Sequence, residues 1–323
     1  MALAIFLTII LGSWYLAYHN NSTDPYISNG PNAVWARHQW VGEKHSPQEY
    51  QNLAKSFIDH KITDVFFHVG PLNENGLIEK EKYLFAPDLI TELKKTYPTL
   101  HIQAWMGQVE KKGGGILDLS NLQTKNNIVT TAIELLDLGF DGIHYDIEPI
   151  YAGDSNFIEL LQATRKITKE RKKILSAATD ELEPFWNIGT LLKPFSPAAG
   201  FWNEQYYQKV SANCDQVAVM MYDTALTSNW LYAALVQWET EKISKNIPPE
   251  TILFMGVPTY EDKRWSFHPE AENMESGLRG IQQTIKKISP EKLKNFGVAV
   301  YAEWTTDENE WQTYKKIWLG EKF

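Results

Sequence analysis

The chain contains very little cysteine and no excess of basic charge. Cys214 is the only cysteine among 323 residues, which excludes an intrachain disulfide and a zinc site built from cysteines. Because no activating base is indicated near it, we expect Cys214 to be an ordinary buried thiol. The net charge is −9, from 31 basic and 40 acidic residues. This balance argues against a nucleic-acid partner, since phosphate binding needs a basic surface.

Charged residues are also missing from the N-terminus. The first eighteen residues, MALAIFLTIILGSWYLAY, carry no charged side chain. An apolar run of about 17–18 residues is at the lower limit of a membrane span and exceeds the usual apolar core of a signal peptide. We therefore expect residues 1–24 to be a signal peptide or a membrane anchor with a short linker, in which residues 2–18 would form the tether. A buried N-terminal helix is the alternative.

Aromatic residues, by contrast, are abundant. The chain has 12 tryptophan and 15 tyrosine residues, and many of them stand beside polar residues where strands are expected to end. The indole ring combines a large apolar face with an N–H donor, which suits the flat apolar faces of sugar rings. Most of these side chains are expected in the core, but their number favours a carbohydrate ligand.

Beyond residue 30, short apolar runs alternate regularly with helical patterns. Several of the helical patterns begin at capping residues, namely Ser46, Ser155 and Asp307. The apolar runs are rich in β-branched and aromatic residues, as strands are. They cover Val34–Trp40, Asp64–Gly70, Leu100–Val109, Phe140–Ile150, Ile174–Thr179, Gln216–Asp223, Thr251–Tyr260 and Phe296–Trp304.

Eight strands that alternate with eight helices predict parallel βαβ units. Eight units in about 290 residues fit a closed (β/α)8 TIM barrel better than a doubly wound open sheet, which commonly has fewer strands. No low-complexity linker divides the chain, so we predict one α/β domain over residues 25–323. In such a barrel the functional site lies at the C-terminal ends of the strands, and these ends are where unusual polar residues stand.

The fourth apolar run, LGFDGIHYDIEPI, carries ionisable side chains at alternate positions. Successive strand residues point to opposite faces, so His144, Asp146 and Glu148 share one face. We expect this face to line the barrel interior. The opposite, apolar face consists of Ile143, Tyr145 and Ile147 and should pack against the helices.

When two carboxylates lie about 6.6 Å apart along a strand, like-charge repulsion and desolvation raise the pKa of at least one of them. A carboxyl group that stays protonated near neutral pH can donate a proton to a glycosidic oxygen. Asp146 and Glu148 therefore indicate acid catalysis. The structural alternative is a buried salt-bridge network, in which Arg37 or Arg264 would neutralise the pair.

The segment DGIHYDIE resembles the signature DGxDxDxE of glycoside hydrolase family 18, the chitinase-like group, which ends the fourth strand of a (β/α)8 barrel. The resemblance implies that Glu148 is the general acid and that Asp146 orients the N-acetyl group of the substrate. His144 stands where the family has a central aspartate that shares protons with the catalytic aspartate. An imidazole at this position could hydrogen-bond to Asp146 with a different pH response.

Segments at the ends of the sixth and seventh strands extend the resemblance. QVAVMMYDT is similar to the M-x-Y-D motif of the family, which implies that Tyr222 donates a hydrogen bond to the N-acetyl oxygen and that Asp223 lines the same subsite. GVPTYEDKRW is similar to the G-hydrophobic-P-x-Y stretch that precedes a tryptophan. It would supply Tyr260 to the cleft, together with Arg264 or Trp265.

The third and eighth strands match the family less closely. QAWMGQ retains the glycine of the motif S-x-G-G but not its serine, and we expect Trp105 in this segment to bind substrate. On the eighth strand the family places a tryptophan as the floor of the cleavage subsite. FGVAVYAEW offers both Tyr301 and Trp304 for this role, and the sequence does not choose between them.

These segments together predict hydrolysis of β-linked N-acetylhexosamine polysaccharides with retention at the anomeric carbon. In family 18 the N-acetyl carbonyl of the substrate is the nucleophile, so neither a protein nucleophile nor a cofactor is expected. The catalytic residues would be Glu148, Asp146 and Tyr222. The substrate-binding residues would be His144, Asp223, Tyr260, Tyr301, Trp304 and Trp105. We expect a monomer that is secreted or membrane-anchored, with the barrel outside the cytoplasm.

Two other functions compete with this prediction. A barrel of the same fold can bind sugars without catalysis, and the unusual His144 is the best support for such a lectin. A divalent metal could instead bind His144, Asp146 and Glu148, with His38 and His68 as further ligands. Side chains two residues apart on one strand converge poorly, however, so we expect no metal.

Overall fold

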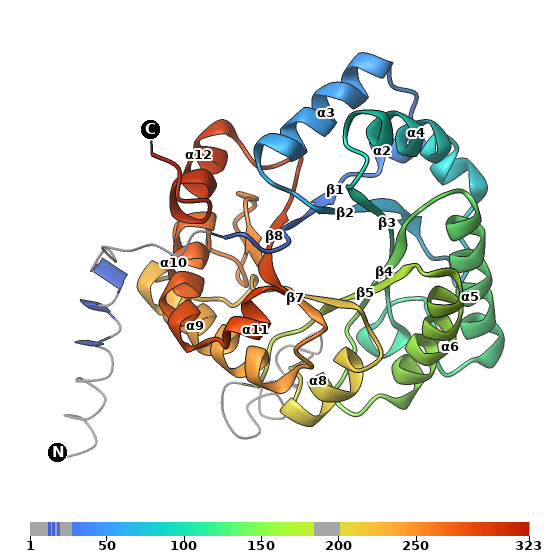
Figure 1. The fold of residues 1–323 in the computed structure, drawn as a ribbon. Coiled ribbons are helices and arrows are strands. Elements are labelled where there is room, and N and C mark those ends of the chain that lie inside the picture. The colour runs from blue at the N-terminus through green and yellow to red at the C-terminus, as the bar shows by residue number, and fades with distance from the viewer. Residues whose placement is uncertain (1–11, 14, 17, 20–27, 184–200, 323) are drawn as a thin grey trace.

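The computed structural model describes residues 12–13, 15–16, 18–19, 28–183 and 201–322 (Figure 1). Most of the expected leader, residues 1–24, lies outside the described residues. In the part of the chain that is described, no helix is both long enough and apolar enough to cross a membrane.

Eight parallel strands form a closed barrel in which the first strand pairs with the last. The predicted (β/α)8 TIM barrel is therefore confirmed, and the open-sheet alternative is wrong. Figure 1 looks into the ring of strands. The strands are β1 (Ala33–Ala36), β2 (Asp64–Pro71), β3 (His101–Val109), β4 (Gly142–Glu148), β5 (Ile174–Thr179), β6 (Gln216–Val219), β7 (Ile252–Pro258) and β8 (Phe296–Tyr301).

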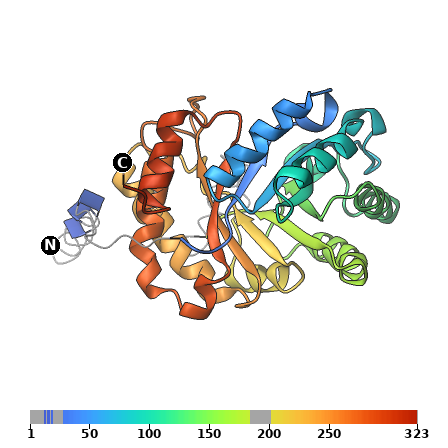
Figure 2. The same cartoon turned by 45° about the horizontal axis from the view of Figure 1, so that its top comes forward.

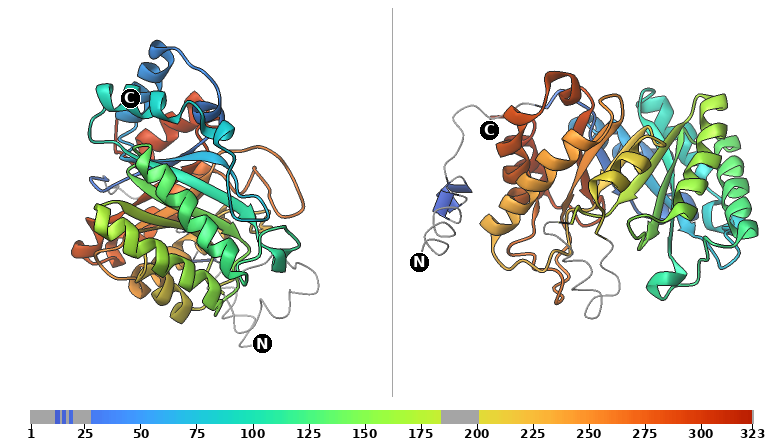
Figure 3. Two further views of the ribbon diagram at one scale, coloured as in Figure 1. Left: turned by 90° about the vertical axis from the view of Figure 1, so that its right-hand side faces the viewer. Right: turned by 90° about the horizontal axis from the view of Figure 1, so that it is seen from below.

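Helices surround the barrel, as the views in Figures 2 and 3 show. The α-helices are α2 (Gln39–Gly42), α3 (Pro47–Asp59), α4 (Ala86–Thr96), α5 (Leu122–Asp137), α6 (Ser155–Arg171), α8 (Glu204–Ser211), α9 (Asn229–Asn246), α10 (Met274–Thr284), α11 (Pro290–Leu293) and α12 (Glu308–Ile317). The short 3-10 helices are η1 (Lys80–Tyr83), η2 (Lys111–Gly113) and η3 (Ile285–Lys287).

The capping residues explain where several helices begin. Ser46 and Asp307 each accept a hydrogen bond from the first turn and form a capping box with a glutamate three residues later, as expected. The prediction of Ser155 as a cap is wrong. The helix already begins at Ser155, so Asp154 before it, in extended conformation, is the cap and accepts the hydrogen bond from the N–H of Asn156.

One face of β4 packs into the apolar core, as the alternation predicts. Ile143, Tyr145 and Ile147 are buried in the main core between strands and helices, where the Tyr145 hydroxyl lies 2.7 Å from Thr164 Oγ1 on α6. A second apolar cluster fills the barrel interior and includes Trp35, Phe66, Trp105 and Phe254. Cys214 is buried, and burial raises the pKa of its thiol, as an inert structural cysteine requires.

Candidate active site

A cavity of about 410 Å³ opens at the C-terminal ends of β4 to β8. It contains six of the expected site residues at once, although they come from segments up to 155 residues apart in the chain. Its lining consists of Asp146, Glu148, Asp180, Glu181, Phe201, Met220, Tyr222, Asp223, Tyr260, Arg264, Trp265, Ser266 and Tyr301.

Asp146 and Glu148 lie side by side at the end of β4. The indole N–H of Trp105 donates to Asp146 Oδ2 at 2.7 Å. The other oxygen, Oδ1, is buried and forms no hydrogen bond of normal geometry with a described residue. Glu148 is exposed to the cavity, yet the surrounding protein desolvates it. Burial and the neighbouring charge of Asp146 raise the pKa of Glu148 well above its usual value, which is the condition that an acid catalyst needs.

The structure corrects two expectations for His144. Its ring is fully buried, so the residue is out of reach of a substrate in the cavity. It also uses both nitrogens away from Asp146: Nε2 accepts from Trp35 Nε1 at 3.1 Å, and Nδ1 lies 2.8 Å from Ser176 Oγ. Nδ1 therefore carries the proton and donates to the serine. The ring stacks on Phe66 with centroids 3.8 Å apart, and burial lowers its pKa to about 3.

The segment after β6 brings Tyr222 and Asp223 into the cavity. β6 ends at Val219, four residues earlier than predicted, so both residues stand on the loop and not on the strand. Asp223 adopts a left-handed backbone with φ 64. Its carboxylate accepts from the Tyr260 hydroxyl at 3.1 Å and from Ser266 Oγ at 3.0 Å. These contacts hold Asp223 and Tyr260 together in the lining of the cavity that also contains Glu148.

Tyr301 lines the cavity, whereas Trp304 does not. The Tyr301 ring stacks on Tyr222 with centroids 5.1 Å apart and an interplanar angle of 25°. It also lies edge-on to Trp35 and to Tyr260, at 5.6 and 5.8 Å. Burial raises the pKa of Tyr301 to about 12. Trp304 stands 5.8 Å from Tyr301, is 39% exposed and is not part of the cavity lining, so Tyr301 is the candidate for the floor position.

The sequence profile of glycosyl hydrolases family 18 matches residues 37–319. The chain belongs to this family. No curated protein matches it in sequence.

Solved structures agree with the family 18 barrel at low identity. The spore cortex-lytic enzyme SleL of Bacillus megaterium QM B1551 has 11% identity and a TM-score of 0.61, over 91% of this chain and 75% of that one. The Group IV chitinase of Ostrinia furnacalis has 14% identity and a TM-score of 0.60, over 91% of this chain and 100% of that one. The chitinase of Chromobacterium violaceum ATCC 12472 has 13% identity and a TM-score of 0.60, with the same coverages. At these identities the likeness concerns the fold alone.

Two cavity carboxylates of this family 18 chain were not predicted. Asp180 and Glu181 directly follow β5, which ends at Thr179 as predicted, and both line the cavity. The overlooked signal is the period of two in ILSAATDE, which puts Ser176, Ala178 and Asp180 on the face next to the ionisable face of β4. Burial and the charge of Glu239 raise the pKa of Glu181.

The arginines proposed to neutralise the carboxylate pair have other partners in the family 18 fold. Arg37 pairs with Glu303 at 3.7 Å, and the Arg264 guanidinium lies over the Tyr260 ring at 5.6 Å. Within the described residues, no group of three or more histidine, cysteine, aspartate or glutamate side chains is arranged to hold a metal ion. His144 is unsuited to be a ligand, because its two nitrogens are already engaged by Trp35 and Ser176.

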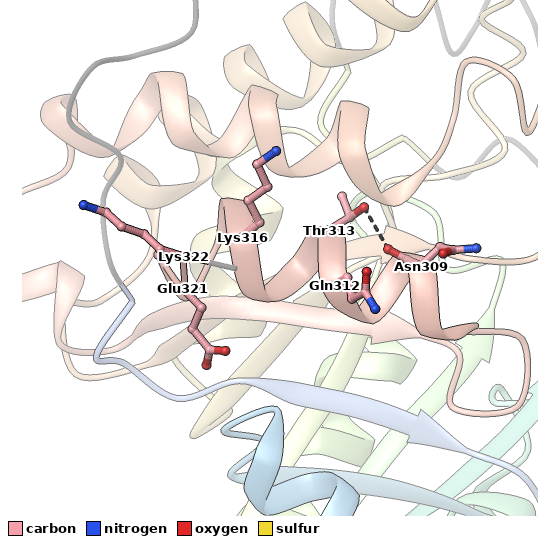
Figure 4. Close-up of a pocket in the computed structure, with 7 residues that line it drawn as sticks. Asn309, Gln312, Thr313, Lys316, Glu321 and Lys322 are labelled. Atoms are coloured by element: carbon pink, nitrogen blue, oxygen red, sulfur yellow. Dashed lines mark hydrogen bonds between the residues drawn. The ribbon is translucent and has the colours of Figure 1, made fainter.

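A second hollow lies on the outer surface of α12 and the chain end that follows it (Figure 4). Its described lining is polar and charged, with Lys316 and Lys322 around Gln312 and Thr313. These residues offer no aromatic face on which a sugar ring could stack. The cavity at the strand ends is therefore the candidate carbohydrate site of this family 18 domain.

Proposed function

We propose that the protein hydrolyses β-linked N-acetylhexosamine polysaccharides by a substrate-assisted, retaining mechanism. The observation that carries this proposal is the pair at the end of β4. Glu148 lines the cavity, and its pKa is raised well above the usual value of a carboxylic acid. Asp146 beside it accepts a hydrogen bond from the indole of Trp105. An acid with a raised pKa and an oriented carboxylate are the two groups that this chemistry requires.

The proposed reaction has two steps. Glu148 donates its proton to the glycosidic oxygen, and the bond from that oxygen to the anomeric carbon breaks while the N-acetyl carbonyl oxygen attacks that carbon from the opposite side. Asp146 accepts a hydrogen bond from the acetamido N–H, and the Tyr222 hydroxyl donates one to the carbonyl oxygen. Water then attacks the anomeric carbon and loses a proton to Glu148, which regenerates the acetamido group and the acid.

The cavity walls fit a sugar in this orientation. Tyr301 and Tyr222 present stacked rings at the floor, and Tyr260 and Asp223 form a hydrogen-bonded pair at one side. Aromatic faces bind the apolar face of a pyranose, and the polar pair can bind its hydroxyls. Trp265, which is 72% exposed at the rim, adds an aromatic surface for a neighbouring sugar.

A screen of the purified protein on oligosaccharides tests the proposal. The structures with the same fold are those of chitinases and of a spore cortex-lytic enzyme, so both chitin and peptidoglycan oligomers belong in the screen, with non-acetylated sugars as controls. We expect cleavage of N-acetylated substrates only, with the β-anomer released first as seen by NMR. Binding without cleavage would favour the alternative of a sugar-binding barrel, and release of the α-anomer would contradict retention.

We further propose that residues 1–24 take the barrel out of the cytoplasm, either as a secreted protein or tethered through residues 2–18, and that residues 25–323 act as a monomer. The uncharged apolar N-terminus supports the proposed localisation. Cell fractionation, accessibility of the barrel to added protease, and light scattering of the purified protein test the three parts. A barrel found only in the cytosol would contradict the proposed localisation.

A further inference from the structure

β4 and β5 pair in parallel, with His144 opposite Ser176 and Tyr145 opposite Ala177. The hydrogen-bonding contact between His144 and Ser176 shows that these paired side chains both face the barrel interior. Because strand residues alternate, the same face continues two and four residues further along each strand. The paired register ends at Tyr145 and Ala177, and just beyond it Asp146, Glu148 and Asp180 line one cavity.

Two residues beyond Ala178 along this face of β5, Asp180 is acidic again. Asp180 lines the same cavity as Asp146 and Glu148. Its backbone is fixed by the Tyr207 hydroxyl, which donates to the Asp180 carbonyl oxygen. Asp180 thus stands at a set position beside Glu148, on the side away from the Trp105 contact that holds Asp146.

His144 cannot supply negative charge to this group. It is neutral, buried and bonded to Trp35 and Ser176, at the position where the family signature has an aspartate. The inner carboxylate of the signature is therefore missing from β4, whereas Asp180, directly after β5, brings a carboxyl group to the same cavity.

We propose that Asp180 is a positioning residue of the active site, which supplies from β5 the further carboxylate that keeps the proton on Glu148. The proposal rests on the function proposed above, in which Glu148 is the acid. Asp180 acts through Glu148 and is not required to touch the reacting atoms.

The charges around Glu148 support this assignment. Asp146 faces it from β4, Asp180 from β5, Tyr222 and Asp223 from the loop after β6, and Tyr301 from β8. Arg264, on the loop after β7, is the basic residue among the described lining residues and lies over Tyr260.

Burial raises the pKa of Glu148 most, followed by the charges of Asp146 and then Asp180. Burial and the charge of Asp146 also raise the pKa of Asp180, while the indole of Trp202 lowers it. Asp146, Glu148 and Asp180 therefore titrate as one coupled group, in which removing any member lowers the proton affinity of the others.

The test compares Asp180→Asn with the wild-type, full-length protein. Asparagine keeps the shape and removes one ionisable carboxyl from the coupled group, so the carboxyl of Glu148 should lose its proton at a lower pH, by about one unit. The basic limb of the pH–rate profile should shift down by the same amount, with little change in KM. Infrared difference spectra follow the protonated Glu148 carboxyl directly, with its band identified by its loss in Glu148→Gln.

Three further variants serve as controls. Asp180→Glu keeps the charge and should leave the titration of Glu148 near that of the wild type. Glu181→Gln removes the adjacent carboxyl, which is not among the main causes of the raised pKa of Glu148, and should shift the titration of Glu148 much less than Asp180→Asn does. Asp180→Ala is a second neutral variant in case the asparagine disturbs folding, which circular dichroism checks.

An unchanged titration of Glu148 in both neutral variants at position 180 would overturn the proposal, as would an equal shift in Glu181→Gln. The infrared titration needs no turnover, so it decides the role of Asp180 even if no tested substrate is cleaved. The proposed function fails separately, if Glu148→Gln retains full activity.

Discussion

His144 allows a quantitative test of how the barrel interior treats an ionisable group. In the native protein the pKa of His144 is lowered from its ordinary value of 6.5 to about 3, so the ring stays neutral until the pH falls to about 3. The unfolded chain therefore binds a proton at His144 as soon as the pH falls below 6.5, and the native state does not. The free energy of unfolding must decrease as the pH is lowered from 6.5 toward 3, and it must be unaffected by His144 above that window.

The size of the effect follows from the pKa difference. Each pH unit inside the window costs about 1.4 kcal/mol. Between about pH 7.5 and pH 4.5, His144 alone should lower the free energy of unfolding by roughly 2.7 kcal/mol. This is a large part of the total stability of an ordinary domain, which is about 5–15 kcal/mol.

His144→Gln isolates this contribution. The glutamine amide can accept from the indole of Trp35 and donate to Ser176, as the ring does, but it does not titrate. We expect the variant to be less stable at neutral pH, because it loses the stacking on Phe66, and to lose less stability on acidification.

Urea unfolding of both proteins at several pH values measures the difference, in which the titration of all other groups cancels. If the difference in free energy of unfolding between the wild type and His144→Gln stays constant from about pH 7.5 to 4.5, the inference that the fold holds His144 neutral is refuted.

Other predictions concern the site and the N-terminus. Glu148→Gln should lower turnover by about 10²–10⁴-fold, while calorimetry still detects oligosaccharide binding; near-normal turnover would remove Glu148 from the mechanism. Trp105→Phe removes the N–H that donates to Asp146 Oδ2, so the pKa of Asp146 should rise. We expect kcat to fall by about tenfold or more and KM to change less. An unchanged kcat in steady-state assays would mean that this hydrogen bond does not orient Asp146. Removal of residues 1–20 should leave folding and activity intact, because the described contacts of this segment with the barrel are few. Examples are Tyr18 with Ser276 at 3.4 Å and Tyr15 with Trp230 at 5.9 Å. A melting temperature of the shortened protein far below that of the full chain would contradict this.

Local patterns were sufficient for much of the fold. Apolar residues at a period of two or 3.6 identify strands and helices within a few residues, because each pattern reflects which face of one element is buried. The same alternation put Ile143, Tyr145 and Ile147 against the helices and Glu148 with Asp146 toward the interior, as the structure has them. The order of motifs along the chain was then sufficient to identify the family.

The ends of strands were predicted less well. β1 stops at Ala36, so that Trp40 belongs to α2 and not to the barrel, and β6 stops at Val219. A strand ends where its neighbours cease to pair with it, and the composition of the run itself does not contain that information. Tyr222 and Asp223 consequently reach the cavity from a loop.

The environment of each site residue was decided only by the tertiary structure. The partners of His144 are Trp35 on β1 and Ser176 on β5, which lie 109 and 32 residues away, so the expected contact with Asp146 two residues along the strand does not form. Barrel closure likewise selects Tyr301 over Trp304 for the cavity and places Asp180 beside Glu148. Sequence spacing determines which side chains share a face, but the register between strands determines which of them meet, and that register depends on the packing of all eight strands at once.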